Sequence, residues 1–182
     1  PTQTRGRAPT RAEPPRPPAN FIIAEDDQTL EGVVLTALLE RGLTLATAEM
    51  FSGGHLAARL APLPGAEKVF RKGIVTREPG ELGINGVSAE TAQSVGRKLR
   101  AESRASHALA LLIDLDEGPD RPDFGGTVCI GIADEGGSVA RQARLIGNRD
   151  WIRAGAVEMG LDCLRRHLFG LPVDERIDFE RR

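Results

Sequence analysis

Four residues in one short segment could take part in chemistry. The segment Ala-Thr-Ala-Glu-Met-Phe-Ser-Gly-Gly, residues 46–54, carries the acid Glu49 and ends in Ser52, Gly53 and Gly54. A serine at the start of a helix can attack an acyl carbon, and glycine N–H groups beside it can hold the oxyanion that forms. Glycines also let a ligand approach the main chain closely. A plain strand–turn–helix connection uses the same residues, so the segment alone leaves both interpretations open.

The chain has three histidines, and only His55 falls near this segment. It could act as a base toward Ser52. However, residues three apart at the start of a helix need not meet productively, so a surface histidine is favoured. His107 and His167 lie in different predicted elements, with no spacing typical of metal ligands. We therefore expect no metal and no other cofactor.

An acidic run forms a second candidate, because carboxylate oxygens could bind a cation. The run consists of Asp114, Asp116, Glu117, Asp120 and Asp123. Its spacing does not fit a calcium loop, since Pro119 stands where a turn glycine is needed and Gly125 where a bidentate glutamate belongs. A solvated acidic loop is the favoured interpretation.

The elements that must position these residues alternate between helices and strands. Helical spacing follows Asp26 and Asp27, the expected N-caps, and ends at Gly42. Further helices are predicted over residues 54–60, 88–103 and 151–168, and strands over 43–48, 69–76, 108–113, 126–133 and 139–145. Residues 135–137 predict a hairpin turn between the last two strands. This order indicates an α/β protein, a three-layer α/β/α sandwich around a mixed sheet, in which residues 46–54 form the kind of junction where ligands bind.

Length and composition limit the organisation of the chain. Its 182 residues suit one core, placed at residues 26–170, between a Pro- and Arg-rich tail at 1–25 and a charged tail at 171–182. The formal net charge of −2 argues against a nucleic-acid partner. Cys129 and Cys163 are interpreted as buried reduced thiols, and no apolar run is long enough to span a bilayer. We therefore expect a cytoplasmic protein without a membrane partner.

Several segments in order carry a resemblance to one family. They are "TLATAEMFSGGHLAARLAPLPGAEKVFRKGIVT", "GVSAETAQSVGRKLR", "FGGTVCIGIAD" and "GNRDWIRAGAVEMGLDCLRRHLFG". From about Leu30 to Leu168 the chain resembles the C-terminal domain of the CinA family, the nicotinamide-nucleotide amidohydrolases. The resemblance implies an α/β/α fold, homo-oligomers, and hydrolysis of the carboxamide of nicotinamide mononucleotide without a metal.

The match to the family's motif is incomplete at the position of its proposed nucleophile. That motif usually reads Ala-Glu-Ser-Cys-Thr-Gly-Gly. Glu49, Gly53 and Gly54 match it and Ser52 replaces Thr, but Met50 stands at the nucleophilic serine and Phe51 at the cysteine. A thioether cannot form an acyl intermediate.

Two further segments depart from the family pattern. Arg77 and Leu82 stand where the resemblance implies a Tyr and a Lys that assist proton transfer, and the chain contains no tyrosine. In a third loop Gly118 and Pro119 fit, but residues 114–117 carry acids that would oppose a ligand phosphate.

These departures lead to two hypotheses. In the first, the domain keeps the family fold, has lost the amidohydrolase activity, and acts by binding a small nucleotide or through contacts in a homo-oligomer. The residues expected to bind the ligand are Glu49, Gly53, Gly54, Arg77, Gly118 and Pro119. In the alternative, Ser52 is the nucleophile of an active amidohydrolase on nicotinamide mononucleotide or another amide.

Overall fold

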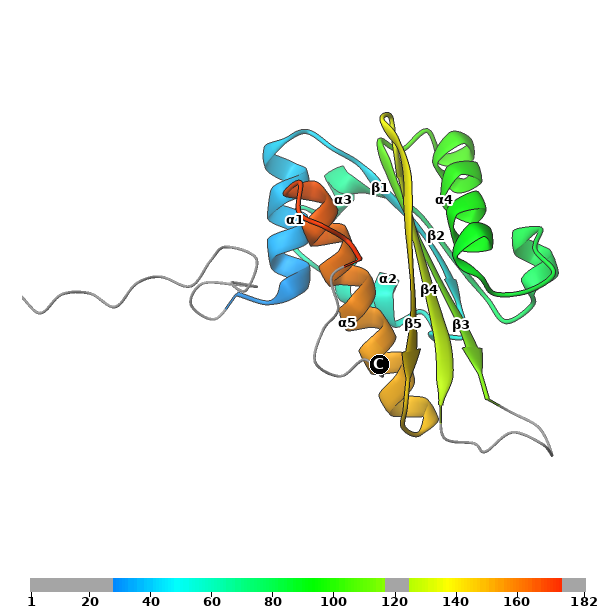
Figure 1. Ribbon diagram of the computed structural model, residues 1–182. Coiled ribbons are helices and arrows are strands. Elements are labelled where there is room, and N and C mark those ends of the chain that lie inside the picture. Colours follow the sequence, from blue (N-terminus) through cyan, green and yellow to red (C-terminus); the bar gives the residue numbers. More distant parts are fainter. Residues whose placement is uncertain (1–27, 117–124, 175–182) are drawn as a thin grey trace, which may run out of the picture.

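The computed structural model describes residues 28–116 and 125–174. Five strands form one mixed sheet in the order β2-β1-β3-β4-β5 (Figure 1). They are β1 (Leu45–Met50), β2 (Phe70–Thr76), β3 (His107–Leu115), β4 (Gly126–Asp134) and β5 (Gly137–Leu145). β1 is parallel to β2 and β3, whereas β4 and β5 run antiparallel to their neighbours. The predicted α/β sandwich with a mixed sheet is confirmed.

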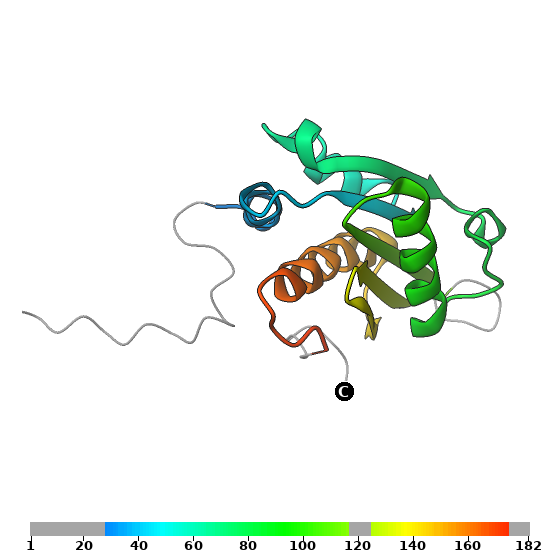
Figure 2. The same cartoon turned by 90° about the horizontal axis from the view of Figure 1, so that it is seen from above.

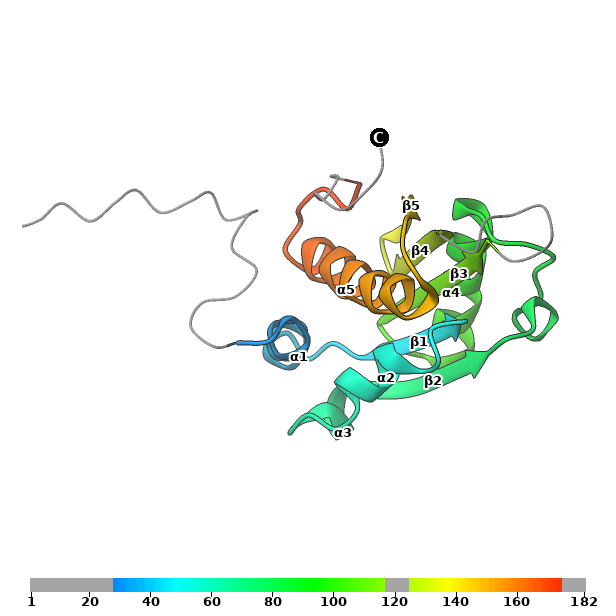
Figure 3. The same cartoon turned by 90° about the horizontal axis from the view of Figure 1, so that it is seen from below.

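Helices cover both faces of the sheet (Figure 2). One face carries α1 (Leu30–Glu40), α2 (His55–Leu60), the short α3 (Ala66–Val69) and α5 (Arg149–Leu168), whose buried side chains share one core. The other face carries α4 (Ala89–Ser103) and the 3-10 turn η2 (Pro79–Leu82), whose side chains join a second core. Figure 3 shows α2 lying against the sheet beside α5. Among the described residues, no helix combines the length and apolar character needed to cross a bilayer.

Local capping explains where the helices begin and end. Ser88 and Asn148 accept backbone hydrogen bonds as N-caps, as predicted. At α1 the cap is Thr29, whose hydroxyl accepts from the N–H of Gly32; the expected caps Asp26 and Asp27 lie outside the described residues. Gly42 ends α1 with a φ of 63° and hydrogen-bonds to Leu39, while the N–H of Leu43 reaches Leu38. Because this end motif occupies residues 42 and 43, β1 begins two residues later than predicted.

The alternation of side chains in β1 divides its residues between the two cores. Ala46, Ala48 and Met50 lie in the core under α4, and Leu45 lies in the core under α1 and α5. All six residues of β1 are buried, as expected for an inner parallel strand covered on both faces. Glu49 therefore faces the α2 and α5 side of the sheet, opposite to Met50.

The packing of α4 on β4 depends on Gly131. A Cβ atom at this position would lie 2.1 Å from the carbonyl oxygen of Ala92, a backbone atom that cannot move without displacing α4. We expect Gly131→Ala to lower the free energy of unfolding by roughly 1–3 kcal/mol or more. Gly86→Ala is the matched control, because a Cβ there meets nothing within 4 Å. Urea denaturation of both variants tests this, and equal midpoints would contradict it.

Candidate ligand site at the strand–helix junction

The junction between β1 and α2 is a tight left-handed turn. Phe51, Gly53 and Gly54 have φ values of 63°, 73° and 80°. Such values suit glycine, but for a bulky residue such as Phe51 they store strain that the surrounding structure must hold. The N–H of Phe51 donates to the carbonyl of Thr76 at 3.3 Å, and its carbonyl accepts from Nε of Arg153 at 3.0 Å. Strands β1 and β2 and helix α5 thus hold the turn from three sides.

The carboxylate of Glu49 caps α2 in place of an N-cap side chain. It accepts hydrogen bonds from the N–H of Leu56 at 2.9 Å and of Ala57 at 2.8 Å. The N-cap residue itself is Gly54, which has no side chain to do this. Glu49 is fully buried, and its negative charge lies at the positive end of the helix. The geometry gives this residue a structural role in the turn.

Ser52 is engaged by the same cap. Its hydroxyl donates to Oε2 of Glu49 at 2.5 Å and accepts from the N–H of Gly54 at 3.2 Å. The residue is 0% exposed. The hydroxyl therefore closes a hydrogen-bonded ring under the turn.

Met50 and Leu82 occupy the two positions where the motif comparison places a nucleophile and a lysine. The structure brings both into the apolar core beneath α4, where they are 2% and 6% exposed. Ile84 and Leu112 belong to the same cluster. Met50 and Leu82, which are 32 residues apart in the sequence, thus share one apolar environment.

A cavity of about 180 Å³ opens beside the turn. Its lining residues come from the turn between β1 and α2, from the end of β2 and the residue after it, and from α5. They are Phe51, Gly53, Val75, Thr76, Arg77 and Arg153. The guanidinium of Arg77 lies over the ring of Phe51, 5.4 Å from its centroid. Nε of Arg153 donates to the carbonyl of Phe51, and its Nη1 lies 3.8 Å from Oδ1 of Asp150. The cavity therefore combines two cations, one aromatic ring and a glycine.

The predicted site residues are only partly brought together. Gly53 and Arg77 line this cavity, Glu49 and Ser52 lie beneath the turn, and Gly54 ends it. Gly118 and Pro119 lie outside the described residues. Arg153 was missed by sequence reasoning, because only the packing of α5 brings it to residue 51 from 102 positions away.

One acid of the acidic run, Asp116, lies within the described residues beside a cation. Asp116 forms a bidentate ion pair with Arg144 of β5, with Nη1 and Oδ1 3.0 Å apart. The hydrogen bond to Asp116 raises the pKa of Arg144 and outweighs the effect of burial. At least one of the acids is therefore neutralised by a neighbouring strand.

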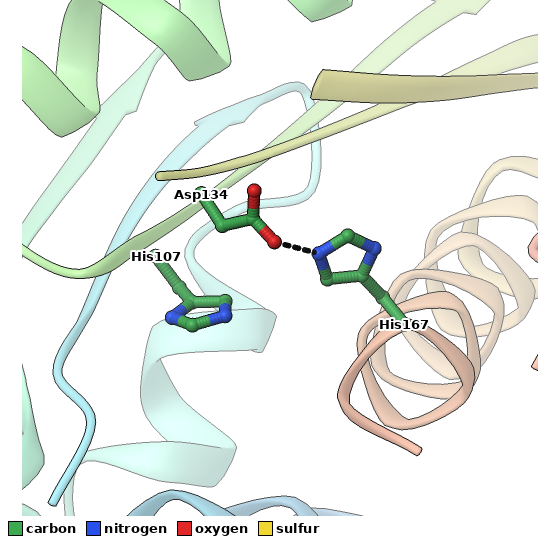
Figure 4. Close-up of side chains that lie close together, drawn as sticks. All are labelled: His107, Asp134 and His167. Atoms are coloured by element: carbon green, nitrogen blue, oxygen red, sulfur yellow. Dashed lines mark hydrogen bonds and ion pairs between the residues drawn. The ribbon is translucent and has the colours of Figure 1, made fainter. Parts of the chain in front are cut away.

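The three histidines do not gather at the junction. His55 is exposed at the start of α2. His107 and His167 instead meet Asp134 at the other end of the sheet, a convergence that no sequence spacing indicated (Figure 4). Burial lowers the pKa of His107. For Asp134, burial favours a higher pKa, but the hydrogen bond and charge of His167 and the N–H groups of Gly136 and Gly137 together outweigh it, so the pKa is lowered.

Fold and junction together define a class of protein: a mixed α/β sandwich with a glycine turn between an inner parallel strand and a helix. The CinA C-terminal domain family matches this sequence over residues 27–78 and 83–168. The chain belongs to that family, which confirms the membership that its motifs predicted.

Similar proteins agree with this assignment. A CinA-like protein of Frankia casuarinae is 40% identical over 161 residues, which are 82% of this chain and 37% of that protein. A putative competence-damage inducible protein of Caldanaerobacter subterraneus is 34% identical over 85% of this chain and 40% of its own length. This chain therefore spans about two fifths of those relatives. The crystal structure of a CinA superfamily protein from Klebsiella pneumoniae superimposes with a TM-score of 0.66 at 25% identity, covering 78% of this chain and 96% of that one.

Proposed function

We propose that this CinA C-terminal domain binds a small anionic ligand of the mononucleotide class at the cavity beside Gly53 and does not hydrolyse its amide. The observation that carries the proposal is the pair of guanidinium groups, Arg77 and Arg153, that line one cavity with the left-handed turn. Guanidinium groups bind phosphate through directed, charge-assisted hydrogen bonds. A phosphate in this cavity would have both arginines in its lining as hydrogen-bond donors.

The turn complements such a ligand. A Cβ at Gly53 would meet nothing within 4 Å, so the space above this residue is open to a ligand. Phe51 offers an aromatic surface, part of which Arg77 already covers. An aromatic face, a glycine and two arginines suit a flat base joined to a phosphate.

The proposed absence of hydrolysis rests on the core beneath α4. Met50 and Leu82 share that apolar core, so the position of the family nucleophile and that of its lysine offer neither an attacking atom nor a base. Arg77 stands at the position of the family tyrosine and has no hydroxyl group that could relay a proton.

The alternative, an amidohydrolase with Ser52 as nucleophile, has one supporting observation. The hydroxyl of Ser52 lies 2.5 Å from Glu49, as a nucleophile would lie from its base. Against it, Ser52 has no exposed surface and Glu49 already accepts from two backbone N–H groups. Attack on a substrate would require the cap of α2 to open, so we favour the binding function.

Calorimetric titration separates these functions. We expect nicotinamide mononucleotide to bind, and the riboside without phosphate to bind at least about tenfold more weakly, since a charge-assisted hydrogen bond contributes more than 1 kcal/mol. Arg77→Gln and Arg153→Gln should each lower the affinity for the mononucleotide by a similar factor. Arg71→Gln is the matched control, because Arg71 is exposed on the same strand as Thr76.

The same samples are assayed for released ammonia. No release is expected from the unmodified protein. Release that Ser52→Ala abolishes would establish the alternative, and equal affinity for the mononucleotide and the riboside would contradict a phosphate site. Homo-oligomeric assembly, which the resemblance implies, stays a prediction.

A further inference from the structure

Three side chains that could ligate a metal converge far from the junction. His107 begins β3, Asp134 ends β4, and His167 lies in the last turn of α5 (Figure 4). One ligand atom from each lies within 4.8 Å of the other two. His107 is buried, and the other two side chains are 18% (His167) and 26% (Asp134) exposed. The cluster is therefore accessible from one side.

Hydrogen bonds hold the ring of His107 in position. The hydroxyl of Ser106 accepts from the N–H of Thr44 at 2.8 Å and lies 2.9 Å from the carbonyl oxygen of Thr44. Nδ1 of His107 lies 2.9 Å from the same hydroxyl, so this contact fixes the ring through Nδ1. With Nδ1 engaged by Ser106, Nε2 is the ring nitrogen left to face a ligand. Histidines that bind metals through one nitrogen commonly have the other nitrogen hydrogen-bonded to a neighbouring oxygen.

The carboxylate of Asp134 is also held in position. Oδ1 accepts from the N–H of Gly137 across the β4–β5 turn at 3.0 Å, which leaves Oδ2 directed at Nε2 of His167, 2.7 Å away. Two ligand atoms, Oδ2 of Asp134 and Nε2 of His167, are thus already adjacent. The third belongs to the ring of His107, which Ser106 holds in position. Only part of this arrangement must move to admit an ion.

We propose that His107, Asp134 and His167 form a binding site for one divalent transition metal ion of the zinc type. Two imidazole nitrogens and one carboxylate oxygen suit such ions, and a fourth position stays open to water from the exposed side. Ligand atoms around tetrahedral zinc lie about 3.4 Å apart, so the widest separation must shorten by at most about 1.4 Å. Nε2 of His167 and Oδ2 of Asp134, which are 2.7 Å apart, must separate by about 0.7 Å. The ion replaces the proton between His167 and Asp134, which moves to Nδ1 of His167.

The electrostatic surroundings set the strength expected of this site. Asp134 contributes one negative charge, and the carbonyl end of α5 adds a partial one, since His167 lies in the last turn. Arg41 and Arg100 are held nearby by carbonyls of Leu168 and Ser106 and contribute positive charge. We therefore expect micromolar rather than tighter binding. Its consequence is structural, because the ion would join the β4–β5 hairpin and the start of β3 to the end of α5.

A titration of the chelator-treated full chain with Co²⁺, followed by its visible absorption, tests the site. One equivalent should bind and be displaced by Zn²⁺. His107→Gln and His167→Gln should each lower the affinity for Co²⁺ by at least about tenfold, because each removes one of three protein ligands. His55→Gln is the matched control, since it removes the remaining histidine of the chain.

Each other outcome overturns the proposal. These outcomes are no Co²⁺ bound at millimolar concentration, equal affinity in all three variants, or loss of binding in His55→Gln. Far-UV circular dichroism shows whether the variants fold, and the partly exposed His167 provides a test even if His107→Gln does not. No nucleotide is present, so the result is independent of the proposed ligand site.

Discussion

Glu49→Gln is expected to destabilise the domain by roughly 2–4 kcal/mol. The carboxylate accepts from Leu56, Ala57 and Ser52 in a fully buried position, and hydrogen bonds to a charged group contribute about 1.5–3 kcal/mol each. An amide keeps one oxygen but turns an NH₂ group toward a donor, so at least one buried N–H of α2 loses its acceptor. Urea denaturation followed by circular dichroism measures the loss.

The matched control is Glu67→Gln in the first turn of α3. Glu67 is also an acid at a helix start, but it is exposed, so its replacement should change the free energy of unfolding by less than about 0.5 kcal/mol. A loss below 0.5 kcal/mol for Glu49→Gln would mean that Glu49 does not hold the junction. Glu49 would then be available to bind a ligand.

Met50→Ser is expected to lower stability by roughly 2–5 kcal/mol and to produce no ammonia from nicotinamide mononucleotide. The change removes most of a side chain that is 2% exposed and leaves a cavity and a hydroxyl in an apolar core. Without a base at Leu82, the new serine has no group to take its proton. Thermal unfolding and an ammonia assay on the same preparation measure both effects.

Met50→Leu separates the two effects, because a volume-conserving apolar change should cost less than about 1.5 kcal/mol and leave the assay at its background. Turnover by Met50→Ser that exceeds that of Met50→Leu would show that another residue supplies the base. The proposed loss of hydrolysis would then depend on one position alone.

Local patterns predicted most of the elements but shifted some of their ends. The α4 helix and its Ser88 cap, the hairpin around residues 135–137 and the Asn148 cap of α5 were all predicted, because capping and turn residues act over three or four positions. The short α3 and the η2 turn were not predicted. Each has four residues, too few for an apolar period to appear.

The sequence predicted the turn of the candidate site, but it did not predict which side chains contact one another there. The sequence of β1 and its glycines indicated a strand–turn–helix junction, and the strict alternation of a strand implies that Glu49 and Met50 face opposite ways. That Ser52 would be used to complete the cap of α2 could not be inferred, since a hydroxyl at this spacing serves a cap or a nucleophile equally well.

By itself, the sequence determined the family, the order of the longer helices and strands, the turn at residues 51–54 and the presence of Met50 in the family motif, because each depends on residue types or on neighbours a few positions apart. Only the tertiary structure decided that Met50 and Leu82 share one apolar core, that Arg153 joins Arg77 at the turn, and that His107 and His167 meet Asp134. Those contacts depend on strand order and on the packing of α5 across the sheet, which bring together residues 27 to 102 positions apart and leave no periodic signal in the chain.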